Sequence, residues 1–237
     1  MPKSISVKQM VNQKYTTIEQ LPGAHGRKMS EEWVKAIGIP CVGFTMLAWG
    51  ESGNGKTTFV MKLCKELNKF GQVYYNSAEQ GHGLSLQQVL KQCQVDECEH
   101  HPFMIGDRDT YDEMVEKLGK ARQKTRFCVI DSLQHMEMTY TQFKELKMRF
   151  PHIAFIAISH ATSSNKPVGS HGRDIRFFSE IKTNVRKGVA YSDSRFGATL
   201  PYRVMPWMGK EVDDEPKPKR GKAKVEADTR QFELEVS

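Results

Sequence analysis

The residue types between positions 50 and 58 predict a site that binds phosphate groups. The stretch reads GESGNGKTT and contains the pattern G-x-x-x-x-G-K-[ST], with an apolar run before it and a helical pattern after it. Glycines let successive backbone N–H groups point into one concavity, and the start of the following helix adds positive potential there. A plain glycine-rich turn is the alternative, and the flanking strand and helix patterns argue against it.

Each residue of this phosphate loop (residues 50–58) has an expected task. Lys56 is expected to reach the β- and γ-phosphates of a nucleotide, and the Thr57 hydroxyl is expected to bind Mg²⁺. The residues predicted to bind the nucleotide are Gly50, Glu51, Ser52, Gly53, Asn54, Gly55, Lys56, Thr57 and Thr58. The chain is therefore predicted to bind a nucleotide together with magnesium.

Three further residues that could do chemistry each follow an apolar run. Asp131 ends the run 127–130, and because an acid at the end of a buried strand is costly unless it meets a cation, it is predicted to lie beside the magnesium. Glu79 is predicted to polarise the water that attacks the γ-phosphate, and His160 to contact that phosphate. The plain alternatives are a strand-end cap or salt bridge for Asp131, a solvated loop acid for Glu79 and a capping role for His160.

Alternating strands and helices must position these residues. Apolar runs of strand character occupy 44–49, 72–76, 103–105, 127–130 and 153–158, and helical periodicity follows at 59–67, 86–90 and 114–118. This alternation predicts an α/β fold with a mainly parallel central sheet and helices on both faces. Since the carboxyl ends of parallel strands share one edge, the phosphate loop, Glu79, Asp131 and His160 are expected to meet there.

The chain divides by composition into three parts. Residues 1–40 are polar, with a short amphipathic segment around Trp33, and are predicted to be a leader strapped onto the core. Residues 41–208 carry the alternating pattern, and the expected core ends there. Residues 209–237 have almost no apolar side chains and mix both charges, which is typical of a disordered tail.

The overall composition limits the classes of protein. No apolar stretch approaches the roughly 20 residues that span a bilayer, and the N-terminus lacks the apolar centre of a signal peptide, so no membrane partner is expected. Five cysteines without a regular framework fit reduced thiols in a cytosol-like compartment. The net charge of +7 favours a polyanionic partner, although many basic proteins bind no nucleic acid.

Four segments after the phosphate loop resemble, in order, those of the RecA/RadA family of ATPases. They are YYNSAEQG (74–81), CVIDSLQHM (128–136), ISHATSSNKPVG (158–169) and SDSRFG (192–197), and the resemblance covers about residues 40–205. It implies a RecA-like P-loop core that hydrolyses ATP with Mg²⁺, with Glu79 as catalytic base and His160 as the residue that senses the γ-phosphate. It also implies that Arg195 reaches the nucleotide of an adjacent subunit, in a ring or a filament.

Some positions depart from the family pattern. The family's lysine in the last segment is Asp193 here, which leaves Arg195 as the clearest trans-acting residue, with Lys187 and Arg186 as further candidates. We find no four-cysteine zinc module, no protease-like domain and no aromatic-x-x-Ala polymerisation motif. The remaining bare core is similar to the short ATPases that phages and other mobile elements use in recombination or single-strand annealing, which implies a bacterial or phage-infected cytoplasm.

Other functions share much of this pattern. A DnaB-like helicase core has most of these segments, and a nucleotide-gated assembly switch with little turnover would need the same nucleotide site. A small-molecule phosphotransferase would need an arginine-bearing lid, and the segment after Glu79 does not resemble one. The sequence leaves annealing, strand exchange and unwinding open.

The residues after His160 are expected to contact DNA. The stretch 160–174 is polar and bears glycines, so we expect a structureless loop where the family places its second DNA loop. Lys166 and Arg173 are expected to neutralise phosphates of single-stranded DNA, and Ser170 to donate a hydrogen bond. The stretch has no aromatic residue, which predicts contact with the backbone rather than base stacking; a plain surface loop is the alternative. A single-strand-binding protein is a further candidate partner. The nearby residues 177, 178 and 181 are predicted to be core.

Overall fold

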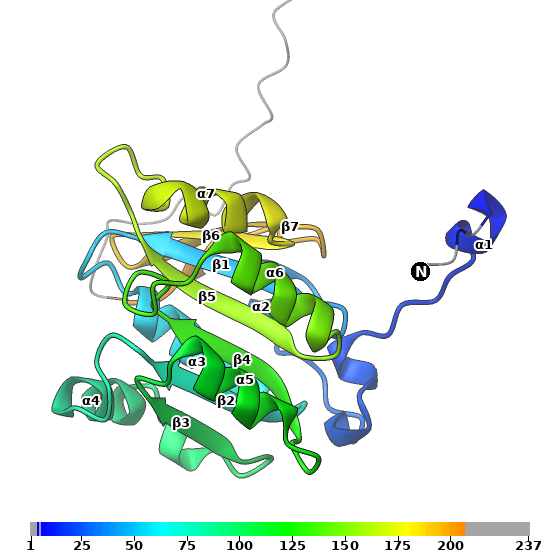
Figure 1. Ribbon diagram of the computed structural model, residues 1–237, viewed down its shortest axis with the longest axis horizontal. Helices are drawn as coiled ribbons and strands as arrows, with labels where there is room; N and C mark the ends of the chain where they lie inside the picture. The colour runs from blue at the N-terminus through cyan, green and yellow to red at the C-terminus, as the bar shows by residue number, and fades with distance from the viewer. Residues whose placement is uncertain (1–3, 5, 207–237) are drawn as a thin grey trace, which may run out of the picture.

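One mixed sheet organises the chain (Figure 1). The computed structural model describes residue 4 and residues 6–206, so the predicted tail at 209–237 lies outside the described residues. The eight strands of the described part follow the order β3-β2-β4-β5-β1-β6-β7-β8. Their bounds are β1 (Thr45–Gly50), β2 (Gln72–Ser77), β3 (Phe103–Asp107), β4 (Thr125–Asp131), β5 (Ala154–His160), β6 (Ile181–Arg186), β7 (Val189–Ser194) and β8 (Tyr202–Arg203).

Six adjacent strands, β3 through β6 in spatial order, are parallel, and β7 and β8 extend the sheet antiparallel. Every residue of β1 is buried, as expected for a strand covered on both faces. The predicted α/β fold class with a mainly parallel central sheet is confirmed.

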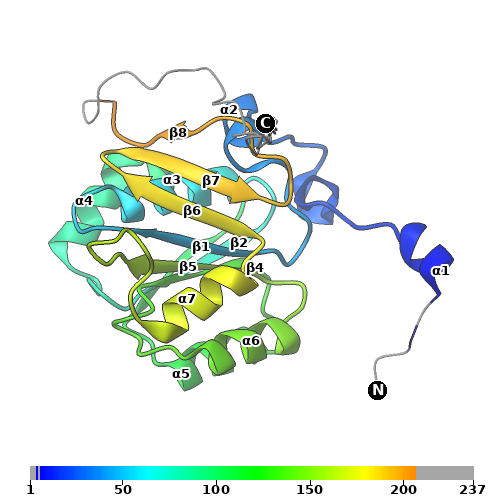
Figure 2. The ribbon, with the colours of Figure 1, turned by 90° about the horizontal axis from the view of Figure 1, so that it is seen from above.

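Helices cover both faces of the sheet (Figure 2). On one face lie α2 (Glu31–Ile37), α3 (Lys56–Leu67) and α4 (Leu84–Gln92), and on the other α5 (Tyr111–Gly119), α6 (Tyr140–Arg149) and α7 (Gly169–Phe178). Two buried clusters follow these layers: Trp33 and Phe59 belong to one, and Met114, Phe143 and Ile175 to the other. The sheet is therefore fixed between two apolar layers, which makes its edge a rigid platform.

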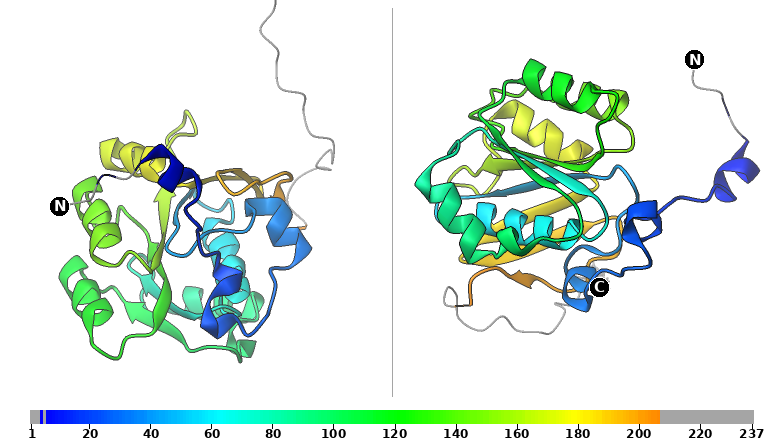
Figure 3. Two further views of the ribbon diagram at one scale, coloured as in Figure 1. Left: turned by 90° about the vertical axis from the view of Figure 1, so that its right-hand side faces the viewer. Right: turned by 90° about the horizontal axis from the view of Figure 1, so that it is seen from below.

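The described residues before position 41 run along the outside of this body (Figure 3). The short helix α1 (Val7–Val11) stands away from the sheet, while the single turns η1 (Ile18–Gln20) and η2 (Pro22–Ala24) and helix α2 lie against it. Trp33 stacks on Tyr202 with ring centroids 4.1 Å apart, which ties α2 to β8. The boundary near residue 40 stays a prediction.

The five predicted strands are present, and each of their ends is shifted by at most two residues. Strands β3 and β4 are longer than predicted by two and three residues. Strands β6, β7 and β8, helix α6 and the turn η3 (Val95–Glu97) were not predicted. Among the described residues, no helix is long and apolar enough to cross a membrane.

The expectation of a structureless stretch at 160–174 is wrong for its second half. Helix α7 begins at Gly169, so Ser170 and Arg173 lie on a helix. Two glycines make this helix weak by propensity, and burial of Gly172 and Ile175 against the body stabilises it instead.

The core prediction for residues 177, 178 and 181 was correct only in part. Ile181 is fully buried and Phe178 packs against Phe143, but the side chain of Phe177 is 70% exposed. Phe177 follows Ile175 by two positions, and residues two apart on a helix do not share a face, so its side chain points away from the core.

Candidate nucleotide-binding site

The phosphate loop joins β1 to α3 at the carboxyl edge of the sheet. Gly50 ends β1, and a Cβ atom there would lie 2.2 Å from the carbonyl oxygen of Val185 on β6, so no larger residue fits. Gly53 and Gly55 have φ of 76° and 93°, a region that favours glycine, and Gly55 is the residue that caps α3. The sequence thus bends the backbone into a loop whose last N–H groups begin a helix, the geometry expected of a phosphate site.

Lys56 lies at the floor of the site. Its side chain is largely buried, and Nζ donates a hydrogen bond to the carbonyl oxygen of Glu51 at 2.9 Å. Burial lowers the pKa of Lys56, while the charges of Glu79 and Asp131 act against this shift. The lysine is therefore a partly desolvated cation, the kind of group that gains most from an incoming phosphate anion.

Asp131 meets the phosphate loop from the end of β4. The Thr57 hydroxyl donates to Asp131 Oδ2 at 3.2 Å, and the buried hydroxyl of Tyr75 donates to the same oxygen. Asp131 Oδ1 is buried without a hydrogen-bond partner in the protein. An orphaned carboxylate oxygen beside a threonine hydroxyl fits Mg²⁺, held directly or through water.

The environment of Asp131 is costly for a negative charge. Burial raises its pKa to about 6, with a further contribution from Glu79, while the hydrogen bonds of Tyr75 and Thr57 and the charge of Lys56 act in the opposite direction. A bound cation would relieve this cost, because it would replace the lost hydration of the carboxylate.

Glu79 follows β2 and is held beside β4. Its backbone N–H donates to the carbonyl oxygen of Asp131 at 2.8 Å. Its Oε2 atom lies 3.5 Å from His135 Nδ1 and 3.4 Å from His160 Nε2. The carboxylate therefore sits between two imidazoles, with one third of its side chain exposed toward the cavity above the phosphate loop.

His160 is fixed through its backbone at the end of β5. Its N–H donates to Gln134 Oε1 at 3.1 Å, and Gln134 Nε2 donates to Ser159 Oγ at 3.0 Å. Burial lowers the pKa of the His160 imidazole, opposed by the charge of Glu79. The hydrogen bonds of Gln134 therefore fix the segment after Asp131 to the end of β5.

A cavity of about 200 Å³ joins these groups. It is lined by Ser52, Gly53, Gly55, Lys56, Thr57, Thr58, Glu79, Gln80, His160 and Met205. The structure thus brings together Lys56, Thr57, Asp131, Glu79 and His160, as expected from the shared edge, and their roles stay predictions. Met205 was missed by the sequence reasoning, because nothing in its surroundings signals that the chain returns to the phosphate loop.

The stretch expected to bind DNA is shorter and better anchored than predicted. Lys166 is exposed in the loop 161–168, which an isolated bridge between Ala161 and Pro167 closes. Trp49 Nε1 donates to the carbonyl oxygen of Asn165 at 3.1 Å, and the Asn165 and Asn184 amides bond to each other at 2.9 Å. The loop is thereby tied to β1 and β6, while Ser170 and Arg173 lie exposed on α7.

The candidate trans-acting residues lie at opposite edges of the sheet. Arg195 follows β7 and its N–H donates to the carbonyl oxygen of Glu180, at the amino edge of the sheet and far from this chain's phosphate loop. Arg186 ends β6 and Lys187 begins the β6–β7 turn, where the Lys187 N–H donates to Asn54 Oδ1 at 2.9 Å. Arg186 and Lys187 therefore lie beside this chain's own loop, and Arg195 does not.

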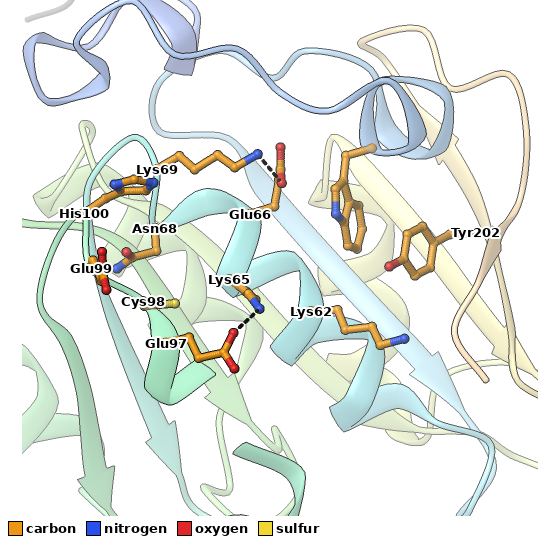
Figure 4. A pocket seen from close by; sticks show the side chains of 11 residues that line it. Lys62, Lys65, Glu66, Asn68, Lys69, Glu97, Cys98, Glu99, His100 and Tyr202 are labelled. Atoms are coloured by element: carbon orange, nitrogen blue, oxygen red, sulfur yellow. Dashed lines mark ion pairs between the residues drawn. The ribbon is translucent and has the colours of Figure 1, made fainter. Parts of the chain in front are cut away.

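A larger cavity of about 420 Å³ lies on the outer side of α3, away from this chemistry (Figure 4). Three lysines border it, but Lys65 pairs with Glu97 and Lys69 with Glu66. Lys62 Nζ donates to the carbonyl oxygen of Val204. Because these cations are already engaged, the cavity offers no strong anion site.

Comparison with known proteins adds little to this geometry. No protein-family model and no curated protein matches the chain. Among solved structures, the chain is similar to one described as "ATPase Domain of G40P", with 14% sequence identity, a TM-score of 0.44, and coverage of 60% of this chain and 69% of that chain. A likeness this slight carries no argument, so the function is argued from the site.

Proposed function

We propose that the chain is an ATPase of the RecA/RadA type that couples hydrolysis of Mg-ATP to binding of single-stranded DNA, in recombination, repair or replication. One observation carries this proposal: Lys56, Thr57, Asp131 and Glu79, from three separate segments, converge at one edge of the sheet. A nucleotide pocket without hydrolysis would need the phosphate loop but not a carboxylate above it.

The phosphate loop and Lys56 bind the phosphates of ATP. Backbone N–H groups and the lysine face the phosphate oxygens, and binding replaces the bond from Lys56 to the Glu51 carbonyl. When Mg²⁺ is bound, it neutralises charge that develops on the β- and γ-phosphates. Thr57 and Asp131 are the residues that would hold it, since their oxygens face each other and Asp131 Oδ1 has no other partner.

Glu79 acts as general base in this proposal. Its carboxylate accepts a proton from the water whose oxygen attacks the γ-phosphorus, while the bond from that phosphorus to the β–γ bridging oxygen breaks and leaves ADP. His160 lies beside both the carboxylate and the cavity, so it contacts the γ-phosphate when ATP is bound and loses that contact after hydrolysis.

Coupling to DNA runs through the residues after His160. The loop 161–168 follows His160 in the chain, and its last residue, Val168, donates its N–H to the carbonyl oxygen of His160. Both ends of the loop are therefore attached to His160. A shift of His160 would therefore move the loop and the exposed Lys166. Arg195, at the opposite edge, completes the site of a second copy, so the active form is a ring or filament rather than a monomer.

The same geometry would serve a DnaB-like helicase core equally well, because unwinding and annealing differ in what surrounds this site rather than in the site itself. A nucleotide-gated assembly switch would differ, since it needs no base at Glu79.

The proposal is tested by phosphate release from Mg-ATP with and without single-stranded DNA, over a range of salt concentrations. We expect turnover that DNA stimulates, and stimulation that fades as salt weakens DNA binding. Turnover without stimulation at any salt would remove the coupling. Nucleotide-dependent assembly with negligible turnover would favour the switch.

A further inference from the structure

A cluster of two histidines and one glutamate stands at the rim of the nucleotide site. Glu79 follows β2, His135 follows β4 and His160 ends β5, so three neighbouring strands each contribute one side chain. One ligand-capable atom from each lies within 4.8 Å of the others. His135 has no part in the hydrolysis proposed above, and nothing in the phosphate chemistry requires it.

The distances from Glu79 to the two imidazoles are long for hydrogen bonds and close to those between two ligands of one metal ion. Glu79 Oε2 lies 3.5 Å from His135 Nδ1 and 3.4 Å from His160 Nε2, beyond the roughly 2.7–3.2 Å of an N–H···O bond. Ligands about 2.0–2.1 Å from a tetrahedral Zn²⁺ are about 3.3–3.4 Å apart. The distance between the carboxylate oxygen and each imidazole nitrogen is therefore close to the distance between two ligands of one metal ion.

The donor set also selects the kind of ion. Two imidazole nitrogens with one carboxylate oxygen suit Zn²⁺ and its first-row neighbours, and a set of three leaves a fourth position open. Mg²⁺ prefers oxygen ligands, which Thr57 and Asp131 offer. The two sites thus differ in chemistry although they share one cavity.

The surroundings hold two of the ligands in place and leave the third accessible. The Glu79 N–H is bonded to Asp131 and the His160 N–H to Gln134, so both backbones are fixed. The His135 side chain is 44% exposed, which gives an ion access from solvent. The nearby cation Lys56 is turned to the Glu51 carbonyl, and the Asp131 carboxylate offsets its charge.

We propose that Glu79, His135 and His160 form a binding site for a divalent first-row transition-metal ion of the Zn²⁺ class, separate from the magnesium position. A consequence follows that rests on the proposed function: a metal bound to Glu79 withdraws electron density from the carboxylate and makes it a poorer acceptor for the water's proton. Occupancy of this site therefore inhibits hydrolysis of ATP.

The binding claim is tested on the full chain without nucleotide, by calorimetric titration with Zn²⁺ and by the visible absorption of Co²⁺. We expect one site per chain, and at least about tenfold weaker binding in His135→Leu, because loss of even an outer partner of a metal ligand costs this much. His152→Leu makes the same change at an exposed histidine outside the cluster and should bind as the natural chain does. The five cysteines are common to all variants, so binding to them cancels.

A second variant guards against a folding artefact. Ser132 Oγ lies 2.9 Å from His135 Nδ1 and competes with a metal for that nitrogen. Ser132→Ala should therefore bind Zn²⁺ several-fold more tightly, an outcome that damage to the fold would not produce. Equal Zn²⁺ affinity in the natural chain and His135→Leu, or no saturable binding at all, would overturn the site.

The inhibitory consequence has its own readout. Zn²⁺ should inhibit ATP hydrolysis by the natural chain and by His152→Leu at concentrations that leave His135→Leu active. If the chain binds Zn²⁺ through this cluster but hydrolyses no ATP, the site stands and the proposed function falls. If it hydrolyses ATP and Zn²⁺ does not inhibit it, the metal does not reach Glu79 and the proposal is wrong.

Discussion

The carboxyl edge of the central strands and the segment that follows β5 are built in different ways. At the edge, Asp131 is 2% exposed and two hydroxyl groups bond to one of its oxygens. In the following segment, Lys166 and Arg173 are exposed, and neither takes part in an ion pair of the described residues. Groups that change bonds must be desolvated and held before the substrate arrives, whereas groups that follow a flexible polyanion need reach and free charge.

The two edges of the sheet differ in a similar way. The carboxyl edge holds four groups expected to act on this chain's own nucleotide, while the amino edge presents Arg195 to solvent. In the proposed mechanism the carboxyl edge lacks only a second cation, besides Lys56, for the transition state, and the amino edge carries a cation without a local substrate. Under the proposed function, this difference means that a second copy of the chain supplies the missing cation.

The largest expected effect comes from removing the arginine at the amino edge while the carboxyl edge is left intact. Arg195→Ala should bind ATP normally but lose on the order of 10³-fold in turnover, because a finger-type arginine acts on the transition state. The exposed Arg122→Ala is the matched control and should keep full activity. The measurement is steady-state ATP hydrolysis at concentrations where the chain self-associates.

Mixing inactive variants sharpens this prediction. Lys56→Ala has no working phosphate loop but keeps Arg195, so a mixture of Lys56→Ala with Arg195→Ala should regain part of the turnover that each lacks alone. Recovery shows that the arginine acts across subunits. A mixture that stays as inactive as its components would contradict the assignment of Arg195 to a neighbouring site.

A smaller effect comes from the burial of Asp131. Its pKa of about 6 lies above the usual 3.8, so the native state binds the extra proton between these values. The free energy of unfolding of the natural chain should therefore fall as pH rises from about 4 to above 6, by on the order of 3 kcal/mol from this group. Asp131→Asn should lack that fall.

Urea unfolding without nucleotide or magnesium, at pH values of about 4, 6 and 8, measures the difference between Asp131→Asn and the natural chain. The free energy of unfolding of Asp131→Asn, relative to that of the natural chain, should rise up to about pH 7 and then level off. The exposed Asp112→Asn should follow the natural chain throughout. A difference that does not change with pH would mean that the carboxylate is better solvated than the structure shows.

The smallest expected effect belongs to the segment after β5. Lys166→Ala and Arg173→Ala should each weaken binding of single-stranded DNA several-fold, and each should lower the slope of log affinity against log salt by about 0.7. ATP affinity should not change, because neither side chain lines the nucleotide cavity. The control is the exposed Lys144→Ala on α6. An unchanged slope in both variants would leave the segment as a plain surface loop.

The sequence was sufficient to predict the strands whose apolar runs are continuous. Strands β1, β2, β4 and β5 are almost wholly buried on both faces, so their apolar runs appear directly in the sequence and the polar residues that end them are easy to locate. For this reason the meeting of Lys56, Asp131, Glu79 and His160 could be expected before the structure.

The sequence was insufficient to predict elements that tertiary contacts, rather than local sequence patterns, stabilise. Strand β6 interrupts its apolar pattern with Lys182, Thr183 and Asn184, although Thr183 and Asn184 are buried and bonded to neighbouring segments. The β6–β7 hairpin was also missed: Lys187 and Gly188 both have positive φ, as a tight two-residue turn requires, but only the glycine favours such a turn in the sequence. Helix α7 was missed because its stability comes from burial rather than from propensity.

The third member of the metal-binding cluster illustrates the same limit. His135 lies four residues after Asp131, in a turn, and nothing in that spacing points to Glu79. Its position follows from the register of β4 between β2 and β5, which brings three strand ends together. Proximity of this kind comes from the sheet order, which the sequence did not predict.

The most direct test of the central claim is the conservative replacement of Glu79. Glu79→Gln keeps the size and hydrogen-bonding capacity of the side chain but removes the group that accepts the proton, so it should bind Mg-ATP with unchanged affinity and lose at least about 10²-fold in turnover. Glu116→Gln, at an exposed position of α5, should match the natural chain in both. If Glu79→Gln hydrolyses ATP at the natural rate, the convergence of groups at this edge is a nucleotide pocket and not a hydrolytic site.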